Sequence, residues 1–422
     1  MMVWLVAAGV LVNIYLAALA RVLSEAEYGR FVSFVSLVLL ISFGGFLPIE
    51  QEMARQFQTG RPGRDVFRSA AVVATGIAAV AAVLVIGLVP WLLPPLADTR
   101  TLTALLCMCG VGVVQFLVRG TLVGTGRMGT HGMVLLADAV LRLGFAGLVV
   151  VGSSAEADAG GYALALIAAI AAAHLPILVW AYRLARRIPG RTGAPASSTG
   201  ETGRAVAHLV AGSISSQILL NASPILVVAV ADAGEADLVG RFAATFTLAR
   251  VLLFIAVPLQ SALVPMFTRV VASGTPEDRR RLAARIGLWA LAATAVSTGL
   301  AWVAGRQLIE IIFGARYALG PRDIALMVGG AMLYLGLIVA AQALVGAQRH
   351  RDVGLAWALA LVVAVIVFSA IPDLVLRAEL AFALGSAVGL LAAVVRLWQE
   401  QGVRSTSDGS AAKEGNANGA II

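Results

Sequence analysis

Long apolar segments follow one another through almost the whole chain. Twelve stretches of about 17 to 26 residues are mostly hydrophobic, and a helix needs roughly 20 apolar residues to cross a bilayer. Backbone polar groups in lipid must be satisfied inside the segment, which favours helices. The sequence therefore predicts an all-α, polytopic integral membrane protein of about twelve transmembrane helices. The segments are Met2–Ala20, Phe31–Ile49, Ser69–Leu93, Leu102–Val118, Gly132–Val151, Gly161–Tyr182, Ala205–Val230, Arg241–Met266, Ile286–Ala304, Asp323–Gly346, Gly354–Ile371 and Glu379–Val395.

The composition excludes a soluble domain, because 60% of the residues are hydrophobic and only 13% are charged. The net charge of +8 could suggest nucleic acid, but its distribution argues against that. Of the 31 Lys and Arg residues, 21 lie in the C-terminal tail or in connections that follow every second span, and eight lie in the opposite connections. Basic residues are retained on the cytoplasmic side. We therefore expect a multi-pass protein of the cytoplasmic (inner) membrane with both termini in the cytoplasm and no nucleic-acid partner.

A polar connection divides the chain into two sets of six spans. Residues Arg183–Arg204 are rich in Gly, Pro, Ser and Thr, which is typical of a flexible linker. The predicted organisation is an N-terminal six-helix bundle (1–182), a cytoplasmic linker (183–204), a C-terminal six-helix bundle (205–395) and a disordered cytoplasmic tail (396–422). We expect Met2–Ala20 to be a retained span, because no small-residue cleavage site of a signal peptide follows it.

The two halves repeat short phrases at equivalent places. Glu25–Phe31 (EAEYGRF) follows the first span, and Glu235–Phe242 (EADLVGRF) follows the seventh. Leu122–Arg127 (LVGTGR) follows the fourth span, and Leu344–Arg349 (LVGAQR) follows the tenth. An even number of spans in each half makes this a parallel repeat. Two similar bundles around a central site are a transporter plan.

Charged residues inside spans are costly and are functional candidates. Arg250 lies near the middle of the eighth span, with no acid on that span or the one before it. Ser213, Gln217 and Asn221 recur every four residues and share one face of the seventh span. If this polar stripe faces Arg250, the two helices line a cavity with one fixed positive charge, which suits a phosphate. The alternative is that Arg250 bonds backbone carbonyls or an acid on another span.

Four other polar sites invite a structural explanation. Arg142 lies four residues after Asp138, so the two charges are expected to neutralise each other. Arg119, at the inner end of the fourth span, is expected to extend its charge to the interface. Asn13 either lines a cavity or joins two helices. Glu50 and Glu52, which follow Pro48, are expected to be solvated, with proton coupling as the alternative.

Enzymatic motifs are missing from the sequence. There is no phosphate-binding loop for ATP, no G-x-S-x-G motif and no Asp-rich metal site. The sequence therefore predicts a protein that is not an enzyme and that needs no cofactor or metal.

Three motifs resemble those of a known family. Ala20–Phe31 (ARVLSEAEYGRF) is similar to the phrase that follows the first span of the polysaccharide-export flippases, the Wzx-type branch. Gly240–Phe242 with Pro265–Phe267 at the end of the eighth span, and the turn Gly124–Arg127, are further matches. This branch belongs to the superfamily that also holds the multidrug-and-toxin exporters and the lipid II flippases. The resemblance covers about 95% of the chain and implies a MATE-like fold of two six-helix bundles.

The resemblance also implies a function. The family moves a lipid-diphosphate-linked oligosaccharide across the cytoplasmic membrane by alternating access, and cationic side chains of a central cavity meet the phosphates. By position, Arg250 and Arg142 match that role, with Arg21 and Arg55 near the mouths of the cavity. The implied partners are a lipid-linked saccharide used in polysaccharide or lipopolysaccharide synthesis, membrane lipids and the polysaccharide assembly machinery.

Two rival functions stay open. A cation-coupled multidrug exporter of the same fold should carry an acid deep in a span, and Asp138 is the sole candidate found in the sequence. A membrane glycan polymerase or glycosyltransferase should carry a catalytic outer loop. The longest outer loop, Gly305–Arg322, offers Glu310 and arginines without a catalytic constellation.

Overall fold

The computed structural model of the chain describes residues 2–152, 158–193, 195–251, 253, 267 and 275–399, and its secondary structure there is helical. Eleven helices in these ranges are long and apolar enough to cross a membrane, which confirms the predicted fold class. The remaining predicted span, Arg241–Met266, lies largely outside the described residues, as do Pro265, Met266 and the tail from residue 400.

The helices follow the predicted spans closely, and most extend beyond them. The N-terminal half contains α1 (Met2–Val22), α2 (Glu25–Leu39), the π-helical turn η1 (Leu40–Phe46), α3 (Leu47–Gln58), α4 (Gly63–Leu92), α5 (Thr99–Gly124), α6 (Met128–Gly152) and α7 (Ala159–Arg186). The C-terminal half contains α8 (Thr199–Val230), α9 (Ala236–Val251), α11 (Pro276–Ile312), α12 (Pro321–Gly346), α13 (His350–Ala370) and α14 (Leu374–Trp398).

Polar side chains mark where several helices begin. Ser24 caps α2 by accepting a hydrogen bond from the backbone N–H of Glu27, and Asp98 caps α5 by accepting one from Thr101. Thr275 and Asp278 cap α11 reciprocally. Such caps satisfy backbone donors that a helix leaves free at its start. They fix the helix starts at the ends of the apolar segments.

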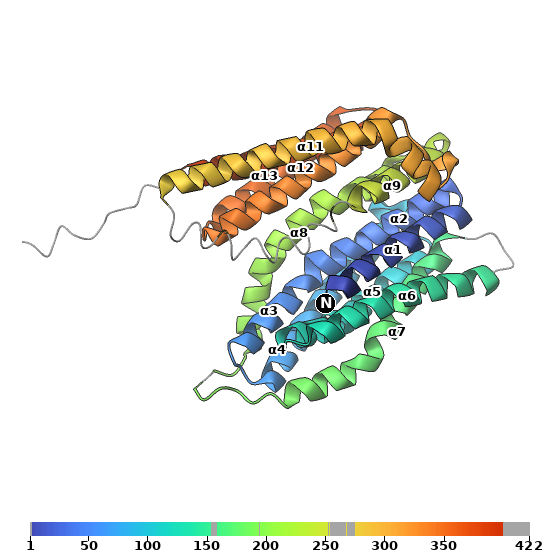
Figure 1. Cartoon of the computed structure of the whole chain (residues 1–422). Helices are drawn as coiled ribbons and strands as arrows, with labels where there is room; N and C mark the ends of the chain where they lie inside the picture. Colours follow the sequence, from blue (N-terminus) through green and yellow to red (C-terminus); the bar gives the residue numbers. More distant parts are fainter. Residues whose placement is uncertain are drawn as a thin grey trace, which may run out of the picture.

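The helices form two blocks that diverge from one end of the molecule (Figure 1). One block holds α1–α7, the other holds α11–α14, and α8 and α9 lie between them. The blocks meet where α2 contacts α9, and they spread apart toward the start of α11 and the α3–α4 connection. We call the spread end the Arg-rich end, because its connections carry most of the arginines, and the other the opposite end.

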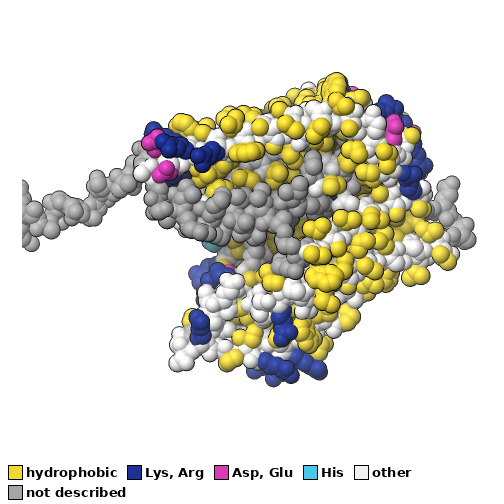
Figure 2. All heavy atoms as spheres, viewed as in Figure 1, with side chains coloured by type: hydrophobic (Ala, Val, Ile, Leu, Met, Phe, Trp, Pro, Cys, Tyr) yellow, Lys and Arg dark blue, Asp and Glu magenta, His cyan; other side chains and the backbone are white. Residues whose placement is uncertain are grey.

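The long sides of both blocks are apolar. Figure 2 shows hydrophobic side chains along the blocks, with arginines gathered toward the ends. Trp91, Val151 and Leu288 are each at least 70% exposed on α4, α6 and α11. Such an apolar surface fits a bilayer and not water.

The connection between the two halves is shorter than the predicted linker Arg183–Arg204, because α7 ends at Arg186 and α8 begins at Thr199. The start of α8 is bound to the N-terminal half. The amide of Gln56 on α3 donates to the hydroxyl of Thr202 at 3.0 Å and accepts from Ser197 at 2.6 Å. Arg61 forms an ion pair with Glu201. The first turns of α8 therefore belong, by contact, to the N-terminal half, and the division into domains stays a prediction.

Candidate functional site

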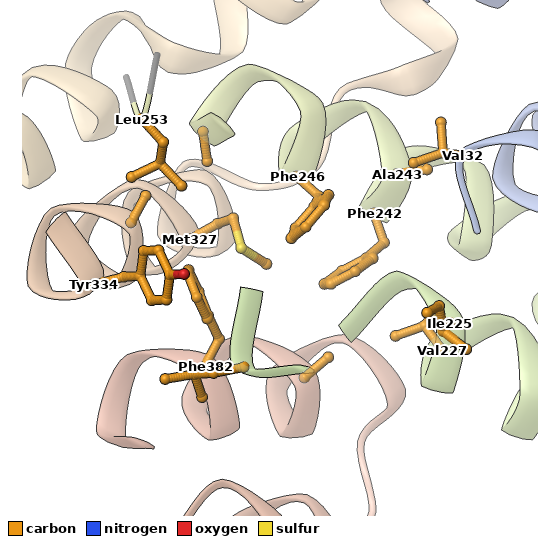
Figure 3. Close-up of a cluster of buried hydrophobic side chains, with 14 of the residues drawn as sticks. Val32, Ile225, Val227, Phe242, Ala243, Phe246, Leu253, Met327, Tyr334 and Phe382 are labelled. Carbon is orange, nitrogen blue, oxygen red and sulfur yellow. The ribbon is translucent and has the colours of Figure 1, made fainter. Parts of the chain in front are cut away.

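A buried apolar cluster surrounds α9 where the two halves meet. Figure 3 shows Phe242 and Phe246 of α9 near Met327 of α12, with Val32 of α2 on the other side. Both phenylalanines are at most 1% exposed. This packing places α9, and the arginine at its end, in the seam between the halves.

Arg250 lies in the last turn of α9, and its side chain is partly buried. The guanidinium carbon stands 5.2 Å from the ring centre of Phe246, a cation–π contact. Among the residues that the structure describes, no carboxylate pairs with it. A positive charge without an acid partner in an apolar seam favours an anion as its ligand.

Tyr334 connects this charge to α8. The phenol of Tyr334, on α12, lies within electrostatic reach of Arg250. Its hydroxyl donates to the backbone carbonyl of Ser216 on α8 at 3.0 Å. Phe382 of α14 lies beside the Tyr334 ring, with ring centres 5.7 Å apart (Figure 3). Tyr334 therefore holds α8, α12 and α14 together next to Arg250.

The predicted polar stripe lies on the same stretch of α8. The side-chain amide of Asn221 donates to the side-chain oxygen of Gln217 at 2.9 Å, and Asn221 is fully buried with its own oxygen unpartnered. Gln217 lies against Gly44 of the π-helical turn η1, and the carbonyl of Ser213 accepts from the hydroxyl of Ser216. Gln217 of the stripe thus lies against the N-terminal half, whereas Tyr334 reaches α8 through the backbone of Ser216.

Arg142 is paired with Asp138 inside the N-terminal half, as the sequence predicted. Its Nε and Nη2 atoms donate to the two carboxylate oxygens at 3.2 and 2.6 Å. Both side chains are largely buried, and the hydroxyl of Tyr15 nearby has no hydrogen-bond partner in the described part of the chain. Because Asp138 neutralises the charge of Arg142, Arg142 attracts an anion less strongly than Arg250 does.

The predictions for Glu50, Glu52 and Arg119 are wrong. Glu50 and Glu52 are buried on α3, at 8% and 2% exposure, and not solvated. Arg119 does not reach the interface, because its Nε atom lies 2.8 Å from a carboxylate oxygen of Glu50 and only 10% of its side chain is exposed. Glu52 accepts from Arg55 at 2.6 and 2.7 Å and from Gln56.

The other predicted site residues lie apart from Arg250. Arg55 is half exposed on α3 toward the Arg-rich end, bound to Glu52. Arg21 lies at the opposite end and donates to the backbone carbonyl of Ile311 at 2.6 Å. The amide of Asn13 donates to Gly9 within α1. Within the described part of the chain, the printed contacts of Arg250 are with Phe246 and Tyr334, whereas Gln217 of the stripe lies against Gly44 of the N-terminal half, so the predicted meeting of the stripe with Arg250 stays a prediction.

The two repeated phrases meet at the opposite end. Gly29 of α2 and Gly240 of α9 stand where the helices touch: a Cβ atom on Gly240 would lie 2.1 Å from the carbonyl oxygen of Glu25, and one on Gly29 would lie 2.9 Å from the backbone nitrogen of Gly240. Only glycine permits this approach. Arg316 adds hydrogen bonds to the carbonyls of Ala20 and Leu23. We call these contacts the glycine seam.

The sequence analysis did not identify two buried polar residues of the C-terminal half. Tyr334 places a polar hydroxyl in the middle of the predicted apolar span Asp323–Gly346, and this feature of the sequence could have identified it as a candidate. Glu379 was placed at the edge of the last span, whereas α14 begins at Leu374 and buries it completely. Neither of its carboxylate oxygens has a partner among the described residues. The residues that the structure describes contain no group of three or more His, Cys, Asp or Glu side chains that could hold a metal ion.

Asp98, which lies outside the predicted spans, contacts Arg30 of α2. The pKa of Asp98, at the opposite end, is lowered from its ordinary value. Partial burial raises this pKa, but hydrogen bonds from Thr101 and the charge of Arg30 outweigh the burial. Arg30 also donates to Glu27 of α2 at 2.7 Å, so Asp98 joins the start of α5 to α2.

Sequence comparison finds distant relatives. No family model matches the chain. The uncharacterised protein Rv3630 of Mycobacterium tuberculosis is 27% identical over 271 residues, which are 62% of this chain and 58% of the relative. The chain thus matches less than two thirds of the length of this relative. The uncharacterised protein Rv1510 of the same organism is 28% identical over 331 residues, 77% of this chain and 73% of the relative.

Solved structures are similar in fold. A multidrug resistance MATE family transporter of the MOP superfamily, in an inward-facing conformation, superposes with a TM-score of 0.68 at 13% identity over 93% of each chain. The lipid II flippase MurJ, in an inward closed conformation, gives 0.66 at 8% identity over 94% of this chain and 88% of that one. The chain therefore has the fold of MOP superfamily transporters, as the resemblance predicted.

A further solved structure has a lower similarity in fold. An outward-facing MATE family transporter of the MOP superfamily gives a TM-score of 0.56 at 15% identity, over 94% of this chain and 93% of that one, against 0.68 for the inward-facing one. In this structure the glycine seam joins the two halves at the opposite end, and the halves spread apart at the Arg-rich end.

Proposed function

We propose that this chain is a flippase that moves a lipid-diphosphate-linked oligosaccharide across the cytoplasmic membrane. The observation that carries the proposal is Arg250, a cation without an acid partner among the described residues, in the seam between two halves of a transporter fold. A diphosphate pays a prohibitive desolvation cost in hydrocarbon. A guanidinium lowers that cost, since arginine binds phosphate oxygens in a fork.

The proposed cycle uses the two ends of the molecule in turn. We place the Arg-rich end and both termini in the cytoplasm, following the arginine distribution. In the present state the glycine seam closes the opposite end, and the head group enters from the cytoplasm toward Arg250 and Gln217. Relative rocking of the halves then opens the glycine seam and closes the Arg-rich end, while the lipid tail stays in the bilayer.

We also propose the polysaccharide assembly machinery as a partner, and the Wzx-type motifs are the support for it. A named structural relative supports the cargo class: MurJ is a lipid II flippase.

A multidrug exporter of the same fold is the second candidate, and one observation favours it. Glu379 is a buried carboxyl without a partner among the described residues, and a cation-coupled exporter is expected to carry such an acid in addition to the neutralised Asp138. The MATE family relative is a multidrug resistance transporter. Arg250 opposes this candidate, because a fixed positive charge repels cationic drugs.

Transport in vesicles separates the two candidates. Purified protein is reconstituted into liposomes with a fluorescent polyprenyl-diphosphate saccharide, and the fraction protected from a membrane-impermeant quencher is followed over time. We expect the native protein to equilibrate the lipid across the bilayer and not to move a cationic dye. Arg250→Ala should abolish this movement, Arg250→Lys should retain part of it, and Arg100→Ala, which removes an exposed arginine, should leave it unchanged. Dye movement without lipid movement would establish the exporter instead.

A further inference from the structure

A groove of about 290 Å³ runs between α13 and α14 on the exposed side of the C-terminal half. Leu355 and Leu359 of α13 line it together with Leu391 and Val395 of α14. These four side chains are between 36% and 62% exposed. An open groove with apolar walls is unfavourable in water and marks a place for an apolar partner.

The groove has the length of one leaflet of a bilayer. It extends along α14 from Val388 to Gln399, a rise of about 16 Å in a helix. The hydrocarbon core is about 30 Å thick, so the groove covers about half of it. Trp398, 48% exposed, lies at the end of the groove, and an amphipathic ring there suits the membrane surface. A single acyl chain of the leaflet at the Arg-rich end therefore matches the groove.

The end of the groove that lies at the Arg-rich end is basic. Arg396 lines the groove there, and 41% of its side chain is exposed. Its Nε atom lies 3.7 Å from a carboxylate oxygen of Asp352, too far for a hydrogen bond, so this contact does not occupy its donors. A guanidinium in this position is complementary to a phosphate.

The acid at this end is already paired. The Nε atom of Arg349 donates to Asp352 at 2.6 Å, and only 12% of the Asp352 side chain is exposed. The Nη1 atom of Arg349 also donates to the backbone carbonyls of Arg396 and Gln399, at 2.5 and 3.0 Å. Arg349 therefore fastens the end of α14 to the start of α13, and the basic end of the groove is formed before any ligand binds.

The start of α13 adds to the positive potential. α13 begins at His350, and its N-cap residue Arg349 makes no side-chain capping hydrogen bond. A helix leaves its first backbone N–H groups without helical partners, and together they attract an anion. The side chains of His350 and Arg351 are exposed at this start. Arg396 and the first turn of α13 thus favour the same kind of ligand.

We propose that this groove binds one anionic glycerophospholipid of the leaflet at the Arg-rich end. Its acyl chain lies between Leu359 and Leu391, and its phosphate binds Arg396 and the start of α13. The lipid joins α13 to α14 and stabilises the C-terminal half. The groove includes none of the residues around Arg250, so the inference goes beyond the proposed cargo and applies to either candidate transport function.

Photo-cross-linking locates the lipid. The full chain is placed in phosphatidylcholine nanodiscs that contain a minor share of phosphatidylglycerol with a diazirine in its acyl chain, and labelled peptides are mapped by mass spectrometry. We expect labels on the α13 and α14 walls of the groove, and far fewer when the diazirine is carried by phosphatidylcholine. Arg396→Gln should reduce this labelling about fivefold. Arg281→Gln, a matched change at a 64% exposed side chain of the same end, should leave it unchanged.

Two further measurements test the groove itself. Leu391→Trp fills the groove at a 62% exposed position and should prevent labelling, whereas Leu288→Trp, at a 70% exposed position of α11, should not. Phosphatidylglycerol should raise the melting temperature of the native protein in detergent more than that of Arg396→Gln.

Equal labelling by the two phospholipids, or labelling that Arg396→Gln leaves unchanged, would overturn the proposed lipid site. Preferential labelling of the groove by a diazirine-bearing polyprenyl diphosphate would overturn it as well and assign the groove to the cargo. Cross-links between the groove and residues 400–422 or a second copy of the chain would assign it to protein instead. Failure of the lipid site leaves the flippase proposal standing, because transport is measured separately through Arg250.

Discussion

We expect replacement of Gly240 by alanine to open the glycine seam. A Cβ atom there would lie 2.1 Å from the carbonyl oxygen of Glu25, against 3.4 Å or more for an ordinary contact, so α2 and α9 would have to move apart by roughly 1 Å. Overpacking of this kind costs about 1–3 kcal/mol. The cost falls on the state in which these helices touch, and it changes the ratio of the two states by about 5- to 150-fold.

The assay measures which end of the molecule is open. Spin-label distances across the glycine seam report the closed and open populations of native protein, Gly240→Ala and Gly234→Ala in nanodiscs. Gly234 is the matched control, because a Cβ atom there meets nothing within 4 Å. Gly240→Ala should shift the population toward an open seam while its circular dichroism stays native, and Gly234→Ala should not. Equal closed populations in all three proteins would refute the proposal that the glycine seam opens and closes during transport.

Three further predictions concern single contacts. Tyr334→Phe removes the hydrogen bond to α8 and should lower the free energy of unfolding in detergent by about 1 kcal/mol; an unchanged value would contradict the contact. Asp138→Asn leaves Arg142 buried and unpaired and should cost about 3–5 kcal/mol, of which the added change Arg142→Gln should recover a part, whereas no recovery would argue against the pair. Since the pKa of Asp98 lies below its ordinary 3.8, its contribution is present at neutral pH and is lost as pH falls through the lowered pKa. The melting temperatures of native protein and Asp98→Asn should therefore differ at pH 7 and converge at acidic pH; a gap that persists in acid would refute this linkage.

The spans were predictable because length and hydropathy alone decide which segments suit a bilayer. The repeated phrases Glu25–Phe31 and Glu235–Phe242 were also visible in the sequence. Their physical meaning was not, because only the folded chain places Gly29 against Gly240. Local pairing was predictable as well: Asp138 and Arg142 share one helix, so their spacing determines their contact.

Long-range pairing explains the failures. Glu50 lies on α3 and Arg119 on α5, and nothing in the spacing of these residues brings them within 2.8 Å. Proximity to a polar connection suggested solvation, whereas the packing of the N-terminal half buries both. Glu379 was overlooked because the span was begun at the acid itself. An apolar run that extends past an acid on both sides, as Leu374–Trp398 does, is the signal that identifies it as buried.

Equilibrium binding tests the central claim most directly. A water-soluble short-chain isoprenyl diphosphate is titrated into purified protein by microscale thermophoresis, with the matching alcohol as the uncharged comparison. Charge-assisted hydrogen bonds contribute about 1.5–3 kcal/mol, so Arg250→Ala should weaken diphosphate binding by about 10- to 150-fold and leave binding of the alcohol unchanged. Equal diphosphate affinities of native protein and Arg250→Ala would contradict the account, because Arg250 would then not recognise the diphosphate.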